Sequence, residues 1–203
     1  MLRNAGNVTR IIACAVFKPA IEHLALEARY PGLQITYLPP NLHLRPVDLR
    51  ARLLQETTSA RERNERVICL YGDCFPDIER FCEDQGLSKV PGHYCYEMLL
   101  GPERFEQLLD EMAETYFAER ELITHFEEYC VRPLELEDEE LRDYCFDHYK
   151  RLLYVHQPSD PDAVIPQAGR VAEFLSLHFD VSDADYSYLE KKLADLLRPD
   201  SGE

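Results

Sequence analysis

The chain has 203 residues, 45% of them hydrophobic, and its 38 acidic and 22 basic side chains give a formal net charge of −16. This length and apolar content suit one globular domain with a sizeable core and exclude wholesale disorder. The acidic excess repels phosphate backbones, and the only basic cluster, residues 61–66, alternates with carboxylates. Nucleic acid is therefore not an expected partner.

No apolar stretch approaches the ~20 residues that span a bilayer, so a membrane is not an expected partner either. Residues 1–7 are polar and lead directly into a predicted strand, without the apolar core of a signal peptide. We therefore expect a cytoplasmic protein. Seven cysteines in such a chain favour thiols, metal ligands or core residues over disulfides.

Short apolar or alternating segments predict the strands. Residues 11–17 are continuously apolar, which is typical of a strand buried on both faces. Residues 32–38 alternate between apolar and polar and end at two prolines, which cannot continue a ladder. The five predicted strands are residues 11–17, 32–38, 66–72, 87–90 and 150–156, of which 87–90 is the weakest. The predicted helices are residues 19–28, 47–61, 76–85, 97–129 with a break near 101–102, 167–177 and 184–197, with an acidic segment at 137–149.

Strands and helices alternate over the first hundred residues, which predicts an α/β fold: three layers around a mostly parallel sheet of four to five strands, with a helical C-terminal portion. We expect a single domain over residues 1–203. Its parts are an alternating core at 9–100, a helical segment at 101–149, a strand at 150–156 and C-terminal helices at 165–198. A purely helical protein is disfavoured, because the strongest strands are too short and too uniformly apolar for amphipathic helices.

Four potential soft-metal ligands follow predicted strands or the loops after them: Cys14, His43, Cys74 and Cys95. The loops at the carboxyl ends of parallel strands form the crevice where ligands bind, so these residues should gather at one edge of the sheet. Thiolate and imidazole ligands suit zinc, an iron–sulfur cluster or another thiophilic centre. Cys14 is equally consistent with a core position, and His43 with a structural role.

Cys74 is also the candidate nucleophile if the protein is a thiol enzyme. Gly72 permits a tight exit from the strand, and a helix predicted to begin near Pro76 would place the thiol at a helix N-terminus, which favours thiolate. His43 or His93 would then act as the base. Arg45, in the proline-braced loop that holds His43, is expected to bind an anionic group of a cofactor.

Several short stretches share their order and spacing with a known family, although none is decisive alone. They are Ile12-Ala13-Cys14, Leu42-His43 with Arg45-Pro46, Tyr71-Gly72-Asp73-Cys74, Cys95 ahead of Leu99-Leu100-Gly101, Phe105 and Tyr154-Val155-His156. Together they resemble the uncharacterised family catalogued as domain of unknown function 1638, over most of the chain.

The resemblance implies a bacterial or archaeal cytoplasmic protein and a link to corrinoid methyl-transfer systems, with a corrinoid or methyltransferase protein as partner. The chain departs from the family pattern before Cys95, where it has Gly92 and Tyr94 in place of arginine and aspartate.

Three functions from different classes remain open. The first is a metal- or metallocofactor-binding protein with a Cys/His site. The second is a thiol or methyl-transfer enzyme that uses Cys74. The third is a non-catalytic protein whose acidic helices bind a basic partner.

Overall fold

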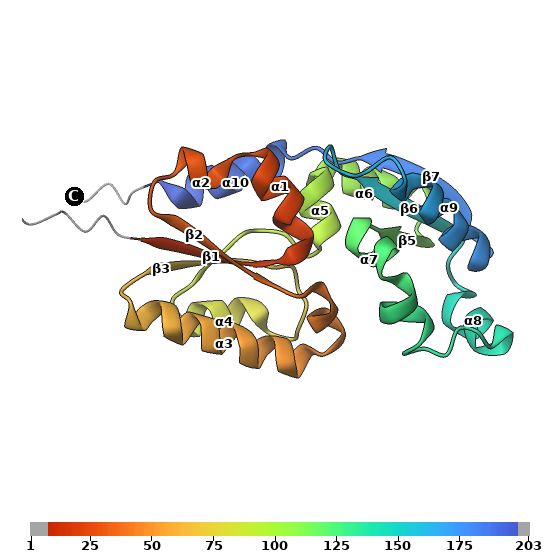
Figure 1. Ribbon diagram of the computed structural model, residues 1–203, viewed down its shortest axis with the longest axis horizontal. Coiled ribbons are helices and arrows are strands. Elements are labelled where there is room, and N and C mark those ends of the chain that lie inside the picture. Colours follow the sequence, from red (N-terminus) through yellow and green to blue (C-terminus); the bar gives the residue numbers. More distant parts are fainter. Residues whose placement is uncertain (1–7, 199–203) are drawn as a thin grey trace, which may run out of the picture.

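The chain folds into two lobes, each built on its own parallel sheet (Figure 1). This computed structural model describes residues 8–198. The first sheet has the strand order β2-β1-β3-β4 and the second the order β5-β6-β7. The first-sheet strands are β1 (Thr9–Cys14), β2 (Leu33–Leu38), β3 (Arg66–Leu70) and β4 (Ser88–Lys89). The second-sheet strands are β5 (Thr115–Ala118), β6 (Arg151–His156) and β7 (His178–Asp183). The predicted α/β class is confirmed.

Helices cover both faces of the first sheet, as its uniformly apolar central strands require. Figure 1 shows α3 and α4 on one side and α1, α2 and α10 on the other. The first-lobe helices are α1 (Lys18–His23), α2 (Leu26–Arg29), α3 (Pro46–Glu62), α4 (Ile78–Asp84) and α10 (Ser187–Leu197), with 3-10 turns η1 (Ala15–Phe17) and η2 (Pro40–Leu44). The helix predicted at 19–28 is divided, because Ala25 adopts a left-handed conformation with φ of 49°.

The register of the two central strands decides which residues share a face. Ile12 of β1 lies beside Cys69 of β3, and Ala13 lies beside Leu70. Side chains alternate between the two faces of a sheet. Continued by one residue, this alternation brings Cys14 and the residue after β3, Tyr71, to the face of Ile12 and Cys69.

The second sheet corrects part of the sequence-based prediction. The segment 101–149, expected to be helical, contains β5, and the predicted helical portion 165–198 contains β7. The strand at 150–156 therefore does not join the first sheet but is the centre of a second one. The remaining helices are α5 (Cys95–Leu100), α6 (Pro102–Glu111), α7 (Arg120–Thr124), the π-helical turn η3 (Glu127–Val131), α8 (Glu139–Phe146) and α9 (Val164–Phe174).

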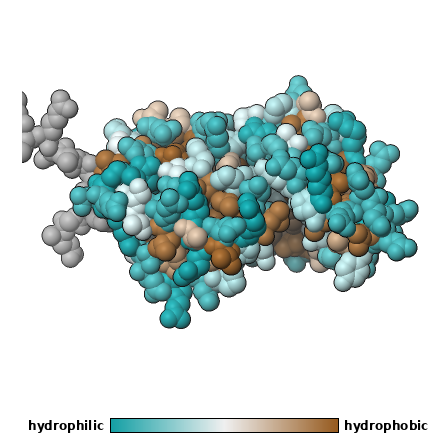
Figure 2. Space-filling model, turned by 60° about the horizontal axis from the view of Figure 1, so that its bottom comes forward, coloured by the Kyte–Doolittle hydropathy of each residue, from teal (hydrophilic) through white to brown (hydrophobic). Residues whose placement is uncertain are grey.

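The four central residues of β6, 152–155, form an apolar run because both faces of the strand are buried. Leu153 and Val155 pack into the core of the first lobe, whereas Leu152 and Tyr154 pack into that of the second. β6 therefore contributes side chains to the cores of both lobes. Figure 2 shows apolar side chains near the middle of the lower face, where the surface is hollowed between the lobes.

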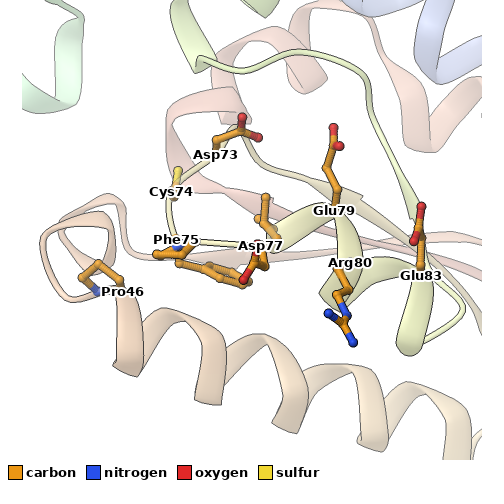
Figure 3. A pocket seen from close by; sticks show the side chains of 10 residues that line it. Pro46, Asp73, Cys74, Phe75, Asp77, Glu79, Arg80 and Glu83 are labelled. Atoms are coloured by element: carbon orange, nitrogen blue, oxygen red, sulfur yellow. The ribbon is translucent and has the colours of Figure 1, made fainter.

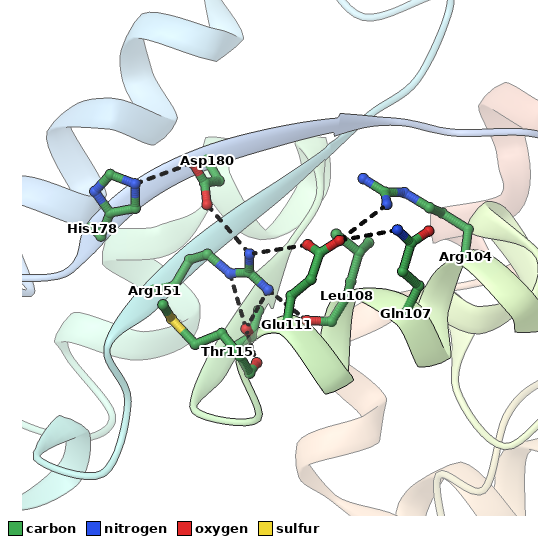
Figure 4. Close-up of polar contacts among 9 residues, drawn as sticks. Arg104, Gln107, Leu108, Glu111, Thr115, Arg151, His178 and Asp180 are labelled. Carbon is green, nitrogen blue, oxygen red and sulfur yellow. Dashed lines mark hydrogen bonds and ion pairs between the residues drawn. The ribbon is translucent and has the colours of Figure 1, made fainter.

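One buried arginine ties the second sheet together (Figure 4). Arg151, 5% exposed at the start of β6, donates from Nε and Nη2 to Thr115 Oγ1 of β5 at 3.0 and 2.9 Å. Its Nη2 also donates to the carbonyl oxygen of Leu108 in α6 at 2.7 Å, and its Nη1 to Asp180 Oδ2 of β7 at 3.3 Å. The guanidinium therefore joins all three strands to α6.

Within residues 8–198, no helix has the length and apolar character needed to cross a membrane.

Candidate functional site

Three cysteines from separate segments lie within electrostatic range of one another, and we call them the thiol group: Cys14, Cys74 and Cys95. Burial raises the pKa of Cys14 to about 12, and a negative charge on Cys74 acts in the same direction. Burial likewise raises the pKa of Cys95 well above its usual value, again with contributions from the other two thiols. Cys14 ends β1 and Cys74 follows β3, so strand ends position these two, whereas Cys95 begins α5.

Direct backbone contact joins the loops of Cys74 and Cys95. The backbone N–H of Asp73 donates to the carbonyl oxygen of His93 at 2.7 Å. A Cβ atom added to Gly72 would lie 2.5 Å from that same oxygen and 3.1 Å from the Cα of Tyr94. Only glycine permits this approach, so Gly72 sets the distance between the two loops.

Replacing Gly72 by alanine should therefore separate the two loops. The atoms that the new methyl group meets belong to the backbone, which cannot rotate away, so we expect a loss of about 1–3 kcal/mol in the free energy of unfolding. Urea denaturation measures this loss. Gly169→Ala in α9 is the control, because its Cβ would make ordinary contacts of 3.7 Å with Phe179 and should raise stability by about 0.4–1 kcal/mol. Equal stability of Gly72→Ala and the wild type would show that the loops are not in tight contact.

Cys74 does not lie at a helix N-terminus, although the sequence predicted that it would. α4 begins only at Ile78, after Asp77 in a left-handed conformation, so Cys74 stands four residues ahead of the helix. Burial, followed by the charge of Asp73, raises the pKa of Cys74 to about 11. Cys74 is thus a neutral thiol at physiological pH, not the thiolate that the helix N-terminus predicted.

His93 is engaged by an aspartate. Its Nδ1 lies 2.8 Å from Asp73 Oδ2, and this hydrogen bond raises the pKa of the exposed imidazole. Lys89, whose side chain is only 9% exposed, approaches Asp73 Oδ1 to 3.5 Å. His93 therefore braces the loop of Cys74.

His43 and Arg45 lie in and after η2, at the carboxyl end of β2. Partial burial lowers the pKa of His43. Arg45 is exposed and pairs with Asp48 at 3.6 Å. The three predicted cysteines thus act on one another electrostatically, and the expected position of His43 and Arg45 beside them stays a prediction.

Cys74 opens onto a cavity of about 700 Å³ (Figure 3). The cavity lies between the loop that leads into α4 and the start of α3 at Pro46. Its charged lining consists of four carboxylates and one guanidinium: Asp73, Asp77, Glu79, Glu83 and Arg80. Cys74 is half-buried, whereas Cys14 is 8% exposed. A ligand entering from this cavity would therefore meet Cys74 first.

Glu119 is a member of the site that the sequence-based prediction missed. It follows β5, is 2% exposed, and accepts the backbone N–H groups of Glu121 and Leu122 at 2.8 and 2.9 Å. Burial raises the pKa of its carboxyl group to about 7, and its charge acts on Cys14 and Cys95. The carboxyl ends of both sheets thus contribute to one site. A polar residue directly after a strand was the available signal, but this strand was predicted to be helical.

Three other cysteines are buried outside the thiol group. The thiols of Cys69 and Cys82 hydrogen-bond each other between β3 and α4, and both are buried. Cys130 is buried in the second lobe, with its sulfur 3.7 Å from the hydroxyl of Tyr116.

Among residues 8–198, no three side chains of the His, Cys, Asp and Glu types lie close enough to hold one metal ion. The donor chemistry of the thiol group suits a soft metal, but a preformed cage of three ligands is not present in the described residues. The predicted ligand set Cys14, His43, Cys74 and Cys95 stays a prediction.

Fold and site together define an α/β protein of two parallel sheets, with thiols and a buried carboxyl group where the carboxyl ends of the strands approach. The chain belongs to the family described as "Protein of unknown function (DUF1638)", which matches residues 37–193. This match confirms the resemblance drawn from the sequence motifs. It includes His43, Cys74 and Cys95 and begins after Cys14. No curated protein and no solved structure matches the chain.

Proposed function

We propose that this protein binds a thiophilic metal centre at the thiol group, with Cys74 as the ligand nearest to solvent and Cys14 and Cys95 behind it. The observation that carries the proposal is that three thiols from segments far apart in sequence act on one another electrostatically. Their raised pKa values make each thiol a poor anion on its own. A soft cation offsets that penalty directly, because it binds the thiolate form and releases the proton.

The cavity beside Cys74 favours a metal carried by a small ligand or cofactor over a bare ion. Its volume of about 700 Å³ falls within the ~300–1,000 Å³ that is typical of small-molecule sites. The carboxylates that line it outnumber the single arginine, which favours a ligand with positive charge. Zinc and an iron–sulfur cluster remain the candidate centres.

A metal-free thiol enzyme is the second candidate, and the pKa of Cys74 weighs against it. A nucleophilic cysteine needs a lowered pKa or an adjacent base. Burial raises the pKa of Cys74 to about 11, and His93 points its Nδ1 at Asp73. The thiol-enzyme proposal would therefore need a partner group that activates Cys74.

Alkylation of Cys74 separates these candidates. In apo protein, its labelling rate with iodoacetamide should rise about tenfold per pH unit from pH 7 to 9.5, because the thiolate fraction is still small throughout that range. After loading with Cd²⁺ the labelling should stop, and a chelator should restore it. Mass spectrometry of the labelled peptides measures both effects.

Cys145, half-buried and outside the thiol group, is the control and should label equally with and without Cd²⁺. A labelling rate of Cys74 that levels off below pH 8 would support the thiol enzyme. If the labelling rate of Cys74 is the same with and without Cd²⁺, the metal site is contradicted and an acidic, non-catalytic binding protein is favoured.

The cellular setting follows from the family resemblance. We propose a cytoplasmic protein that serves a corrinoid or methyltransferase partner. Anaerobic purification followed by elemental analysis and a visible spectrum tests this. A copurified cobalt corrinoid would support the partner, and a metal-free preparation that also fails to bind added zinc, iron or cobalt would contradict the proposal.

A further inference from the structure

A groove of about 420 Å³ lies in the second lobe, between the segment of α7 and η3 on one side and α9 on the other. We call it the second-lobe groove. Its lining shares no residue with that of the cavity beside Cys74. The apolar part of the lining comes from α7, η3, the residue between them and α9: Ile123, Phe126, Val131, Val171 and Phe174.

Contacts across the second-lobe groove hold its two sides in place. Gln167 Nε2 in α9 donates to the carbonyl oxygen of Ile123 in α7 at 3.0 Å. The rings of Phe126 and Phe174 pack edge to face, with centroids 6.4 Å apart, and the guanidinium of Arg142 lies 4.8 Å from the centre of the Phe174 ring. Phe174 nevertheless remains 36% exposed. The groove is therefore already formed in the free protein, with an aromatic ring open to a partner.

The side chains at the margin of this groove are charged. Glu127, Glu137 and Arg170 line it together with the apolar residues. Exposed apolar surface with a polar rim marks an interaction site. Glu127 also begins η3, which is a π-helical turn, and such turns are rare and found mostly at functional sites.

The chain beside the groove is strongly acidic. Residues 127–147, from η3 through α8, contain nine acidic and only two basic side chains. Both arginines already have partners: Arg132 pairs with Glu127 at 3.3 Å, and Arg142 donates to the carbonyl oxygen of Leu136 at 3.1 Å. A partner that complements this surface must therefore combine apolar side chains with positive charge.

We propose that the second-lobe groove binds a basic amphipathic helix of a partner protein. The apolar face of such a helix enters a groove of this kind, while its lysines and arginines face the carboxylates of residues 127–147. An anionic membrane surface would be repelled by these carboxylates, and a second copy of the chain carries the same net charge of −16. The proposal does not depend on the metal site, because the groove contains no residue of the thiol group.

Peptide binding by the full chain, measured by fluorescence anisotropy, tests this proposal. The probe is a fluorescein-labelled helix of about 14 residues, or four turns, with leucine on one face and lysine on the other. A second peptide has glutamate in place of every lysine. At physiological ionic strength the lysine peptide should bind the wild type and the glutamate peptide should not, because only the first complements the acidic surface.

Two substitutions locate the binding. Phe174→Ala removes the exposed ring and should weaken binding of the lysine peptide at least about tenfold, as the loss of an aromatic anchor does. Glu137→Lys reverses a charge of the groove lining and should weaken binding about three- to tenfold. Glu137 is exposed, so this variant should keep the wild-type melting temperature and carries the test if Phe174→Ala does not fold.

Each substitution has a control outside the groove. Val47→Ala shortens an apolar side chain that is 82% exposed in α3 of the first lobe. Glu103→Lys, at an exposed position of α6, changes the net charge by the same amount as Glu137→Lys. Both controls should leave the affinity within about twofold, because charges more than ~8 Å away are screened at this ionic strength.

Three results would overturn the proposal. The first is a lysine peptide that does not bind the wild type. The second is equal weakening by Glu103→Lys and Glu137→Lys, which would show that net charge alone attracts the peptide. The third comes from sedimentation of the protein without peptide: if the wild type self-associates and Phe174→Ala is monomeric, a second copy of the chain occupies the groove.

Discussion

Replacing Arg151 by methionine should lower the free energy of unfolding by about 3 kcal/mol. The guanidinium makes its hydrogen bonds in the interior, to Thr115 Oγ1, the carbonyl oxygen of Leu108 and Asp180. Hydrogen bonds to a charged group contribute about 1.5–3 kcal/mol each, and an acceptor left without a donor adds a desolvation penalty. Asp180 is 40% exposed and regains water, which keeps the total below the sum of the individual bonds.

Urea unfolding measures this loss, and the neighbouring Lys150 provides the control. Lys150 Nζ pairs with Glu114 at 3.3 Å, but the two side chains are 67% and 47% exposed. Surface ion pairs of this kind contribute little, so Lys150→Met should leave the unfolding midpoint nearly unchanged. Similar midpoints for both variants would show that the buried arginine does not stabilise the second sheet.

The free energy of unfolding should fall as the pH rises from about 4.5 to 7, because of Glu119. Burial raises the pKa of this carboxyl group from 4.5 to about 7. In that window the folded protein holds a proton that the unfolded chain has released. The stabilisation is therefore complete below pH 4.5 and is lost as the pH rises through 7. A difference of about 2.5 pKa units corresponds to about 3 kcal/mol.

Glu119→Gln should remove this part of the pH dependence, since an amide does not titrate. The measurement is a series of urea unfolding curves from pH 4.5 to 8, in which the slope of stability against pH is compared with that of the wild type. Comparing slopes also removes the constant cost of the lost N-cap hydrogen bond. Glu121→Gln, whose side chain is 29% exposed, should keep the wild-type slope. A wild-type slope in Glu119→Gln would mean that this carboxyl group has an ordinary pKa in the folded protein.

Much of the first lobe could be predicted from sequence because its signals are local. The apolar run ending at Cys14 and the proline that begins α3 each determine structure within a few residues. The rule that ligands gather after the carboxyl ends of parallel strands then selected Cys14, Cys74 and Cys95, which the structure places in one electrostatic environment. His43 obeys the same rule, since it lies in η2 directly after β2, and its role as a ligand stays a prediction.

The second lobe was largely missed, for physical reasons. β5 has only four residues, and β7 is half-exposed and mostly polar. β5 falls inside a segment predicted to be helical and β7 falls between two predicted helices, and only their pairing with β6 makes them strands. Because β5 was not predicted as a strand, Glu119 was not recognised as a residue that follows one. The pKa of Cys74 was predicted in the wrong direction because burial, which depends on tertiary packing, outweighs the distant field of α4.

The path of the chain sets the order in which the site can be completed during synthesis. α10 follows the second sheet, yet Leu189, Leu193 and Leu197 pack in the core of the first lobe. Domains ordinarily fold as they emerge, beginning at the N-terminus. Here the three cysteines and Glu119 leave the ribosome well before the helix that closes the core around the first sheet. Newly made chains therefore leave these thiols open to the surrounding solution until α10 arrives, so a ligand of the proposed site has access to it before the fold is complete.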